Sequence, residues 1–130
     1  MDNKDIKILM IDDEADFRQL MTFWLKSKGY TVTTATDGKS AVETVKKDPP
    51  DAIFLDLRMP VLDGVEVLKR IRRFNKDVPI IVISAYINDP KARELTSYNV
   101  AGVFYKGENF EDALPLLETA LRRHKKLKKE

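Results

Sequence analysis

A chain of 130 residues has the usual size of one domain and is long enough to bury a real core. Its hydrophobic (43%) and charged (34%) fractions exclude an intrinsically disordered chain, and a net charge of +2 is too small to indicate nucleic-acid binding by itself. The absence of cysteine excludes disulfides and cysteine-ligated metals, and no apolar run approaches the roughly 18 residues of a membrane span. Because residues 1–5 are polar and lack a signal-peptide core, we expect a cytoplasmic protein with no membrane partner.

The first half of the chain alternates between strand and helix patterns. Residues 6–11 are nearly all apolar and 30–36 are rich in β-branched side chains, so both segments are predicted strands. The helix between them has apolar residues at intervals of three and four, and Gly29 ends it. The turn at 37–38 can cap a short helix, which stops before Pro49.

Residues 51–64 organise the rest of the chain. They begin as an apolar run typical of a strand buried on both faces, and Asp56 stands at its end. A turn containing Pro, Asp and Gly follows, and then a helical pattern runs from Val65 to about Asn75. Open α/β sheets build their sites in this way, outside the carboxyl ends of their strands. Taken alone, the stretch is equally compatible with a functional Asp56 and with an Asp56 carboxylate that only caps the loop.

The second half repeats the alternation. Strands are predicted at 78–83, which Ser84 follows, and at 100–105, which Lys106 follows. A short, weakly amphipathic helix should begin at 88–90, with proline in its first turn.

The last helix shows apolar residues on one face from Phe110 to Leu121, and Pro115 lies inside that pattern. Proline is not tolerated in a straight helix interior, so the helix either begins later than the pattern suggests or bends. We favour regular helix from about Glu111.

Five strands alternating with five helices predict an α/β fold, in which helices cover both faces of a parallel sheet. In such a sheet the ends of strands one, three, four and five lie along one edge. That edge would carry three acids, a hydroxyl and a cation, namely Asp12, Asp13, Asp56, Ser84 and Lys106. So selective a set favours a functional site over an ordinary polar surface.

Three neighbouring carboxylates repel one another, since two charges about 4 Å apart cost roughly 4 kcal/mol at an effective dielectric near 20. Protons or a cation must offset that repulsion. Oxygen ligands without His or Cys suit a hard ion, and Mg²⁺ takes one or two carboxylates and recruits phosphate. A carboxylate can also attack phosphorus to form an aspartyl-phosphate, whose oxygens Lys106 and the Ser84 hydroxyl could hold.

Four motifs occur in order at these strand ends: Ile11-Asp12-Asp13-Glu14, Asp56-Leu57-Arg58-Met59-Pro60-Val61-Leu62-Asp63-Gly64, Ser84-Ala85 and Lys106. With them the chain resembles the receiver domain of two-component response regulators over essentially its whole length. The resemblance implies a flavodoxin-like (βα)5 doubly wound sandwich with a five-stranded parallel sheet of strand order 2-1-3-4-5. We expect residues 1–121 to form the receiver domain and 122–130 a basic C-terminal end.

The resemblance also implies roles for the residues at the edge. Asp56 would accept a phosphoryl group from the phosphohistidine of a sensor histidine kinase or a histidine phosphotransfer protein. Asp13 and Asp56 would ligate Mg²⁺ directly, Asp12 would do so largely through water, and the Arg58 backbone carbonyl would be a further ligand. The phosphoryl oxygens would be held by two more side chains, Ser84 and Lys106. The domain would not be an enzyme in the usual sense, but it would catalyse its own phosphorylation and dephosphorylation.

Two departures from the family pattern affect the expected output. Gly107 replaces the proline that usually follows the lysine, so we expect a more mobile loop there. The switch aromatic three residues before the lysine is replaced by Val103. We therefore expect the signal to pass through Ser84, the loop 85–89 and Tyr105 or Tyr86.

The signal should reach a downstream protein at the face of helix four, strand five and helix five, and the chain could also form a homodimer. Arg58 and Tyr86 are bulky and occupy positions that affect phosphoryl lifetime in the family, so we expect slow self-hydrolysis. The basic run 122–129 fits a solvated last turn that complements the helix dipole, and we expect neither direct nucleic-acid binding nor a phosphorelay role for His124.

Two alternatives compete with the switch. A Mg²⁺-dependent aspartyl-phosphate phosphatase would carry a second acid two residues after the nucleophile, where this chain has Arg58. A receiver-fold scaffold that is not phosphorylated would not need the complete set of acids, hydroxyl and lysine.

Overall fold

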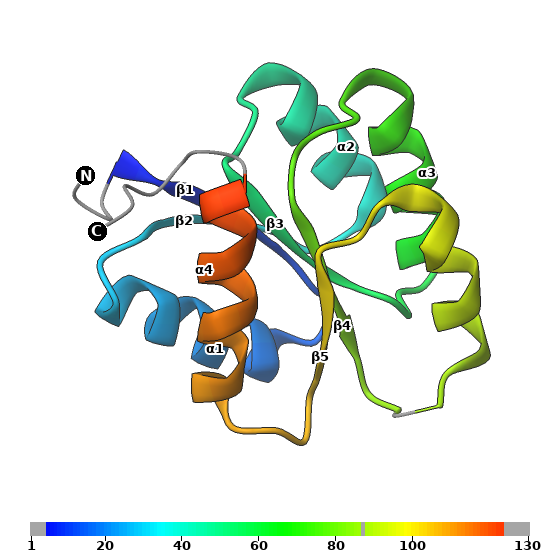
Figure 1. The fold of residues 1–130 in the computed structure, drawn as a ribbon. Helices are drawn as coiled ribbons and strands as arrows, with labels where there is room; N and C mark the ends of the chain where they lie inside the picture. The colour runs from blue at the N-terminus through cyan, green and yellow to red at the C-terminus, as the bar shows by residue number, and fades with distance from the viewer. Residues whose placement is uncertain (1–4, 87, 124–130) are drawn as a thin grey trace.

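The computed structural model describes residues 5–86 and 88–123 and contains one five-stranded parallel sheet in the order β2-β1-β3-β4-β5 (Figure 1). The strands are β1 (Lys7–Ile11), β2 (Thr31–Ala35), β3 (Ala52–Asp56), β4 (Ile80–Ser84) and β5 (Gly102–Tyr105). The helices are α1 (Ala15–Ser27), α2 (Gly38–Lys47), α3 (Gly64–Phe74) and α4 (Ala113–Arg123), with the 3-10 helices η2 (Pro90–Tyr98) and η3 (Phe110–Asp112). The predicted fold class and strand order are confirmed.

Helices cover both faces of the sheet. In Figure 1, α1 and α4 lie on one side, and α2, α3 and η2 lie on the other. Each face of the sheet has its own hydrophobic core, and alternate residues of a strand point into one core or the other. Leu9 and Leu55 pack with α2 and α3, whereas Met10 and Phe54 pack with α1 and α4. All five residues of β3 and of β4 are buried, as their continuous apolar runs predict.

The helix boundaries follow from capping residues. The Asp37 carboxylate accepts a hydrogen bond from the backbone N–H of Ser40 at 2.9 Å, and Asp63 does the same at the start of α3. Gly29 has a φ of 97° just past α1, a left-handed conformation that glycine adopts without steric cost.

The fourth helix differs from the expected regular helix because the segment from Pro90 to Tyr98 is a 3-10 helix. Runs of this length are uncommon in 3-10 form, since the hydrogen-bond geometry is poorer than in an α-helix. Leu95 is the buried residue of η2 among those whose side chains are described, so little apolar packing favours a regular helix there.

The last helix begins later than we favoured. Residues from Phe110 to Asp112 are in a 3-10 turn, and α4 begins at Ala113. Pro115 therefore lies in the first turn, where its missing N–H would have had no helical partner. The late start, which was one of the two alternatives, removes the need for a bend.

None of the helices in the described ranges is long and apolar enough to cross a lipid bilayer.

Candidate functional site

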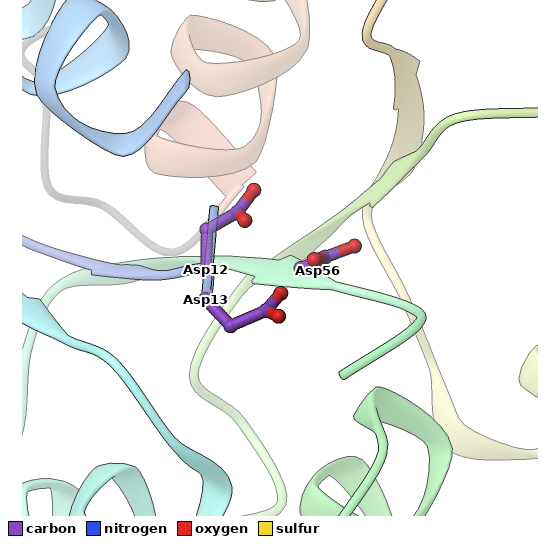
Figure 2. A group of neighbouring side chains, drawn as sticks. All are labelled: Asp12, Asp13 and Asp56. Carbon is purple, nitrogen blue, oxygen red and sulfur yellow. The ribbon is translucent and has the colours of Figure 1, made fainter. Parts of the chain in front are cut away.

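Three carboxylates meet at the carboxyl edge of the sheet. Asp12 and Asp13 directly follow β1, and Asp56 is the last residue of the neighbouring β3. Figure 2 shows the three side chains directed toward a common space. One oxygen from each residue lies within 4.8 Å of the other two. This spacing suits a single metal ion held by several carboxylates.

Asp12 is fully buried, and its two oxygens are unequal. Oδ1 accepts a hydrogen bond from the backbone N–H of Glu14 at 2.8 Å. Oδ2 lies 3.2 Å from Lys106 Nζ but makes no hydrogen bond of acceptable geometry. A buried anionic oxygen without a hydrogen bond is costly, so a further cation here would be stabilising. The donor set, all oxygen, fits a hard divalent ion.

Asp56 is 4% exposed and lies beside other negative charge. Burial, reinforced by the charge of Asp12, raises the pKa of Asp56 from 3.8 to about 7, although nearby Lys106 and a hydrogen bond from the Arg58 backbone N–H act in the opposite direction. The Lys106 ammonium lies 3.7 Å from Asp56 Oδ2. A bound cation would favour the ionised form and so lower this pKa.

Lys106 follows β5 and lies among three carboxylates. Its Nζ is 2.9 Å from Glu14 Oε1, which is nearer than either Asp12 or Asp56, and lies 4.9 Å from the centroid of the Phe17 ring. Burial lowers the pKa of Lys106, but the hydrogen bond to Glu14 and the adjacent acids outweigh it and the net shift is upward. Glu14 was not among the predicted site residues, although it directly follows the acidic pair in the sequence.

Ser84 ends β4 at the same edge and is almost fully buried. Its hydroxyl donates to the carbonyl oxygen of Tyr86 at 2.8 Å and accepts from the Tyr86 N–H at 3.2 Å. The hydroxyl is therefore engaged with its own loop and would have to rotate to reach a group bound at Asp56.

The Arg58 side chain makes a contact that local sequence signals do not predict. Its Nε and Nη2 donate to the two carboxylate oxygens of Asp89 at 2.7 Å and 2.6 Å. Asp89 is 31 residues away and reads in the sequence only as a helix start. The guanidinium also lies 5.8 Å from the centroid of the Tyr86 ring.

An open cavity of about 720 Å³ connects these groups. It is lined by Asp13, Glu14, Phe17, Leu20, Asp56, Leu57, Arg58, Ala85, Tyr86 and Lys106. The lining combines acids and a lysine with apolar side chains, so the cavity can admit an anionic group together with a hydrated cation.

A doubly wound sheet with acids, a hydroxyl and a lysine at its carboxyl edge defines a class of α/β proteins that bind their ligands at this edge. The chain belongs to the response regulator receiver domain family, which it matches over residues 8–118. It is therefore a receiver domain of the two-component type, and the resemblance seen in the sequence is confirmed.

Individual relatives agree with this assignment. The chain is 35% identical to the response regulator MprA of Mycobacterium ulcerans over 127 residues, which cover 92% of this chain and 52% of that protein. It is 42% identical to the transcriptional regulatory protein PrrA of Mycobacterium tuberculosis over 79 residues, or 61% of this chain and 34% of that protein. Among solved structures it is similar to the chemotaxis protein CheY4 of Vibrio cholerae, with a TM-score of 0.82, 32% identity and coverage of 88% and 98%.

The chain spans about half the length of the MprA relatives it matches. At the C-terminal end the structure describes Arg122 and Arg123, which belong to α4. The rest of the predicted basic run, with His124, lies outside the described residues.

Proposed function

We propose that this receiver domain accepts a phosphoryl group on Asp56 from a phosphohistidine, in a Mg²⁺-dependent step that changes its affinity for a partner protein. The observation that carries the proposal is the meeting of Asp12, Asp13 and Asp56 within 4.8 Å, with a buried Asp12 oxygen that lacks a hydrogen bond. Lys106 at 3.7 Å from Asp56 completes the set.

The metal would be held by Asp13 and Asp56 directly, by Asp12 largely through water, and by the backbone carbonyl of Arg58. Mg²⁺ bound there supplies positive charge that offsets the repulsion between the carboxylates and the incoming phosphoryl oxygens. Asp13 is exposed while Asp12 is buried, which agrees with a direct ligand at the open side of the site and a more remote one behind it.

In the transfer, an oxygen of the ionised Asp56 carboxylate forms a bond to phosphorus as the phosphorus–nitrogen bond of the donor histidine breaks. The bonding electrons leave with the imidazole, which is already protonated on its other nitrogen or takes up a proton from water. Lys106 pairs with one phosphoryl oxygen, and the Ser84 hydroxyl turns from the Tyr86 carbonyl to donate to another. Later hydrolysis of the acyl phosphate by water returns Asp56 and releases phosphate.

The partners follow from this reaction. The donor would be a sensor histidine kinase or a histidine phosphotransfer protein. The downstream partner, or a second copy of the chain, would bind the face made by η2, β5 and α4. We assign the receiver function to residues 1–121 and expect no direct nucleic-acid binding by this domain or by the basic end, 122–130.

The test is intact mass measured after incubation with Mg²⁺ and acetyl phosphate. The wild-type chain should gain one phosphoryl group, and Asp56→Asn should gain none, because the nucleophilic oxygen pair is replaced by an amide. Asp51→Asn, which alters a half-buried acid at the opposite end of β3, is the matched control and should be phosphorylated like the wild type. Stoichiometric phosphate on Asp56→Asn would contradict the assignment.

A further inference from the structure

The Arg58 backbone lies beside the proposed phosphoacceptor Asp56, but the Arg58 guanidinium pairs with a different carboxylate. The backbone N–H of Arg58 is 3.3 Å from Asp56 Oδ1, and the side chain lines the same cavity as Asp13 and Asp56. An arginine side chain that starts there is long enough to pair with the carboxylates of this cavity. The guanidinium is instead bound in a two-point fork to Asp89, with the Tyr86 ring beside it.

Asp89 is well suited to hold that cation. Its side chain is fully buried, and Oδ1 also accepts a hydrogen bond from the Lys91 N–H at 3.0 Å, which caps η2. A buried carboxylate needs a partner, and a bidentate guanidinium is the geometrically most specific one available. The fork therefore fixes the direction of the Arg58 side chain.

We propose that Asp89 is a positioning residue of the acidic site, because it pairs with the Arg58 guanidinium, keeps that cation from pairing with Asp13 and Asp56, and so leaves these two acids free to bind a divalent cation. The inference rests on the proposed function. Lys106 already supplies one cation to this cavity, at 3.7 Å from Asp56. A second cationic side chain that paired with the same carboxylates would compete with Mg²⁺ for both charge and space.

The test removes the charge of Asp89 while preserving its shape. Asp89→Asn retains a side-chain oxygen that can accept from Lys91 N–H, but it no longer holds the guanidinium as an ion pair. We expect the released guanidinium to pair instead with the carboxylates of the cavity, which Arg58 also lines. We expect Mg²⁺ binding, measured by calorimetry, to weaken about tenfold in this variant, as a competing charge pair predicts.

Two further variants separate positioning from structural damage. Arg58→Ala combined with Asp89→Asn removes the competing cation and leaves no buried charge unpaired, so Mg²⁺ affinity should return toward the wild-type value. Lys91→Ala breaks the ion pair with Asp63, which links the same two loops outside the cavity, and should leave Mg²⁺ affinity unchanged.

The arginine Nε–Hε resonance gives a second readout. In Asp89→Asn the Arg58 signal should shift when Mg²⁺ displaces the guanidinium from the carboxylates of the cavity, whereas in the wild type it should stay nearly constant. Wild-type Mg²⁺ affinity in Asp89→Asn, or a loss that persists in the double variant, would overturn the inference. Intact Mg²⁺ binding with no phosphorylation of Asp56 would instead overturn only the proposed function.

Discussion

Asp12 Oδ2 and Thr22 Oγ1 are the two buried side-chain oxygens without a hydrogen bond in the part of the chain that the structure describes. Of the two, Asp12 Oδ2 lies among other carboxylates, where an unsatisfied charge is most costly. Lys106 cannot satisfy the whole site, because its ammonium is nearest to Glu14 and is shared with Asp12 and Asp56. At the scale of single residues, the acidic group could therefore hold a further cation.

We predict unequal effects of the two neighbouring acids on metal binding. Asp13→Ala should weaken Mg²⁺ binding by about tenfold or more, because a direct ligand is lost, whereas Asp12→Ala should have a smaller effect as its contact would pass through water. Calorimetry at constant pH and ionic strength measures both affinities. Asp16→Ala, an exposed acid of α1, is a matched control for the loss of one negative charge. Unchanged affinity in both Asp12 and Asp13 variants would refute the proposed metal site.

At the scale of elements, the loop after β3 is held against the end of β3 and against the start of η2. Gly64 at the start of α3 packs so closely that a Cβ atom there would lie 2.2 Å from the Asp56 carbonyl oxygen, which explains why glycine occupies this position. The Arg58–Asp89 fork and the Lys91–Asp63 ion pair join the same loop to the start of η2. A displacement at Asp56 can therefore reach η2 through these contacts as well as through β5.

Val103 is half-buried against the core shared with α3 and η2, and its branched side chain has few rotamers and less volume than the aromatic usual in the family. Tyr105 lies on the same face of β5 and pairs with Ser84 in the sheet register, and the backbone carbonyl and N–H of Tyr86 bond to the Ser84 hydroxyl. A switch through Ser84 would therefore move one of these tyrosines.

Backbone amide shifts with and without beryllofluoride, a phosphoryl mimic, test this route. Tyr105→Ala or Tyr86→Ala should reduce the shifts that extend to η2, β5 and α4, whereas Val103→Ala should preserve them. Each variant must still bind beryllofluoride, which the shifts near Asp56 report. Loss of the distant shifts in Val103→Ala alone would exclude the tyrosine route.

At the scale of the whole molecule, the acidic site reduces the stability of the metal-free protein. The pKa of Asp56 is raised from 3.8 to about 7, chiefly by burial. A group with a raised folded-state pKa favours folding while it is protonated, and that contribution is lost as the pH rises from about 4 through about 7. Asp63 and Asp89 act oppositely: Asp89 pKa is lowered chiefly by its bond to Arg58, and Asp63 pKa is lowered because Lys91 and backbone hydrogen bonds outweigh burial.

We therefore predict a pH-dependent effect of Asp56→Asn on thermal stability. Without metal, the variant should raise Tm at pH 8 by a few degrees, the shift expected for about 1 kcal/mol in a domain of this size. At pH 5 the difference should be smaller, because the wild-type carboxyl is then protonated in the folded state and only its ionisation in the unfolded state still disfavours folding. Saturating Mg²⁺ should stabilise the wild type more at pH 8 than at pH 5. A Tm difference independent of pH would contradict the assigned cause.

The sequence by itself determined the architecture and which strand ends meet at the acidic edge. The alternation of apolar strands with amphipathic helices defines a parallel sheet, and the parallel arrangement brings the ends of distant strands to one edge. Local hydrophobicity predicts the buried strands, and the site residues lie at or just after the ends of those strands. The sequence could therefore group Asp12, Asp13, Asp56 and Lys106.

Contacts between loops were decided only by the tertiary structure. Arg58 with Asp89 and Lys106 with Glu14 join residues 31 and 92 positions apart, and no local period specifies which loop side chains will face one another. The same holds for the Ser84 hydroxyl, whose direction depends on the path of the loop after β4. The sequence pattern also did not predict the 3-10 form of η2. Helix periodicity indicates which face of a segment is apolar, but it does not distinguish an α-helix from a 3-10 helix. Because η2 has one well-buried residue among those whose side chains are described, the contacts at its ends decide between the two forms.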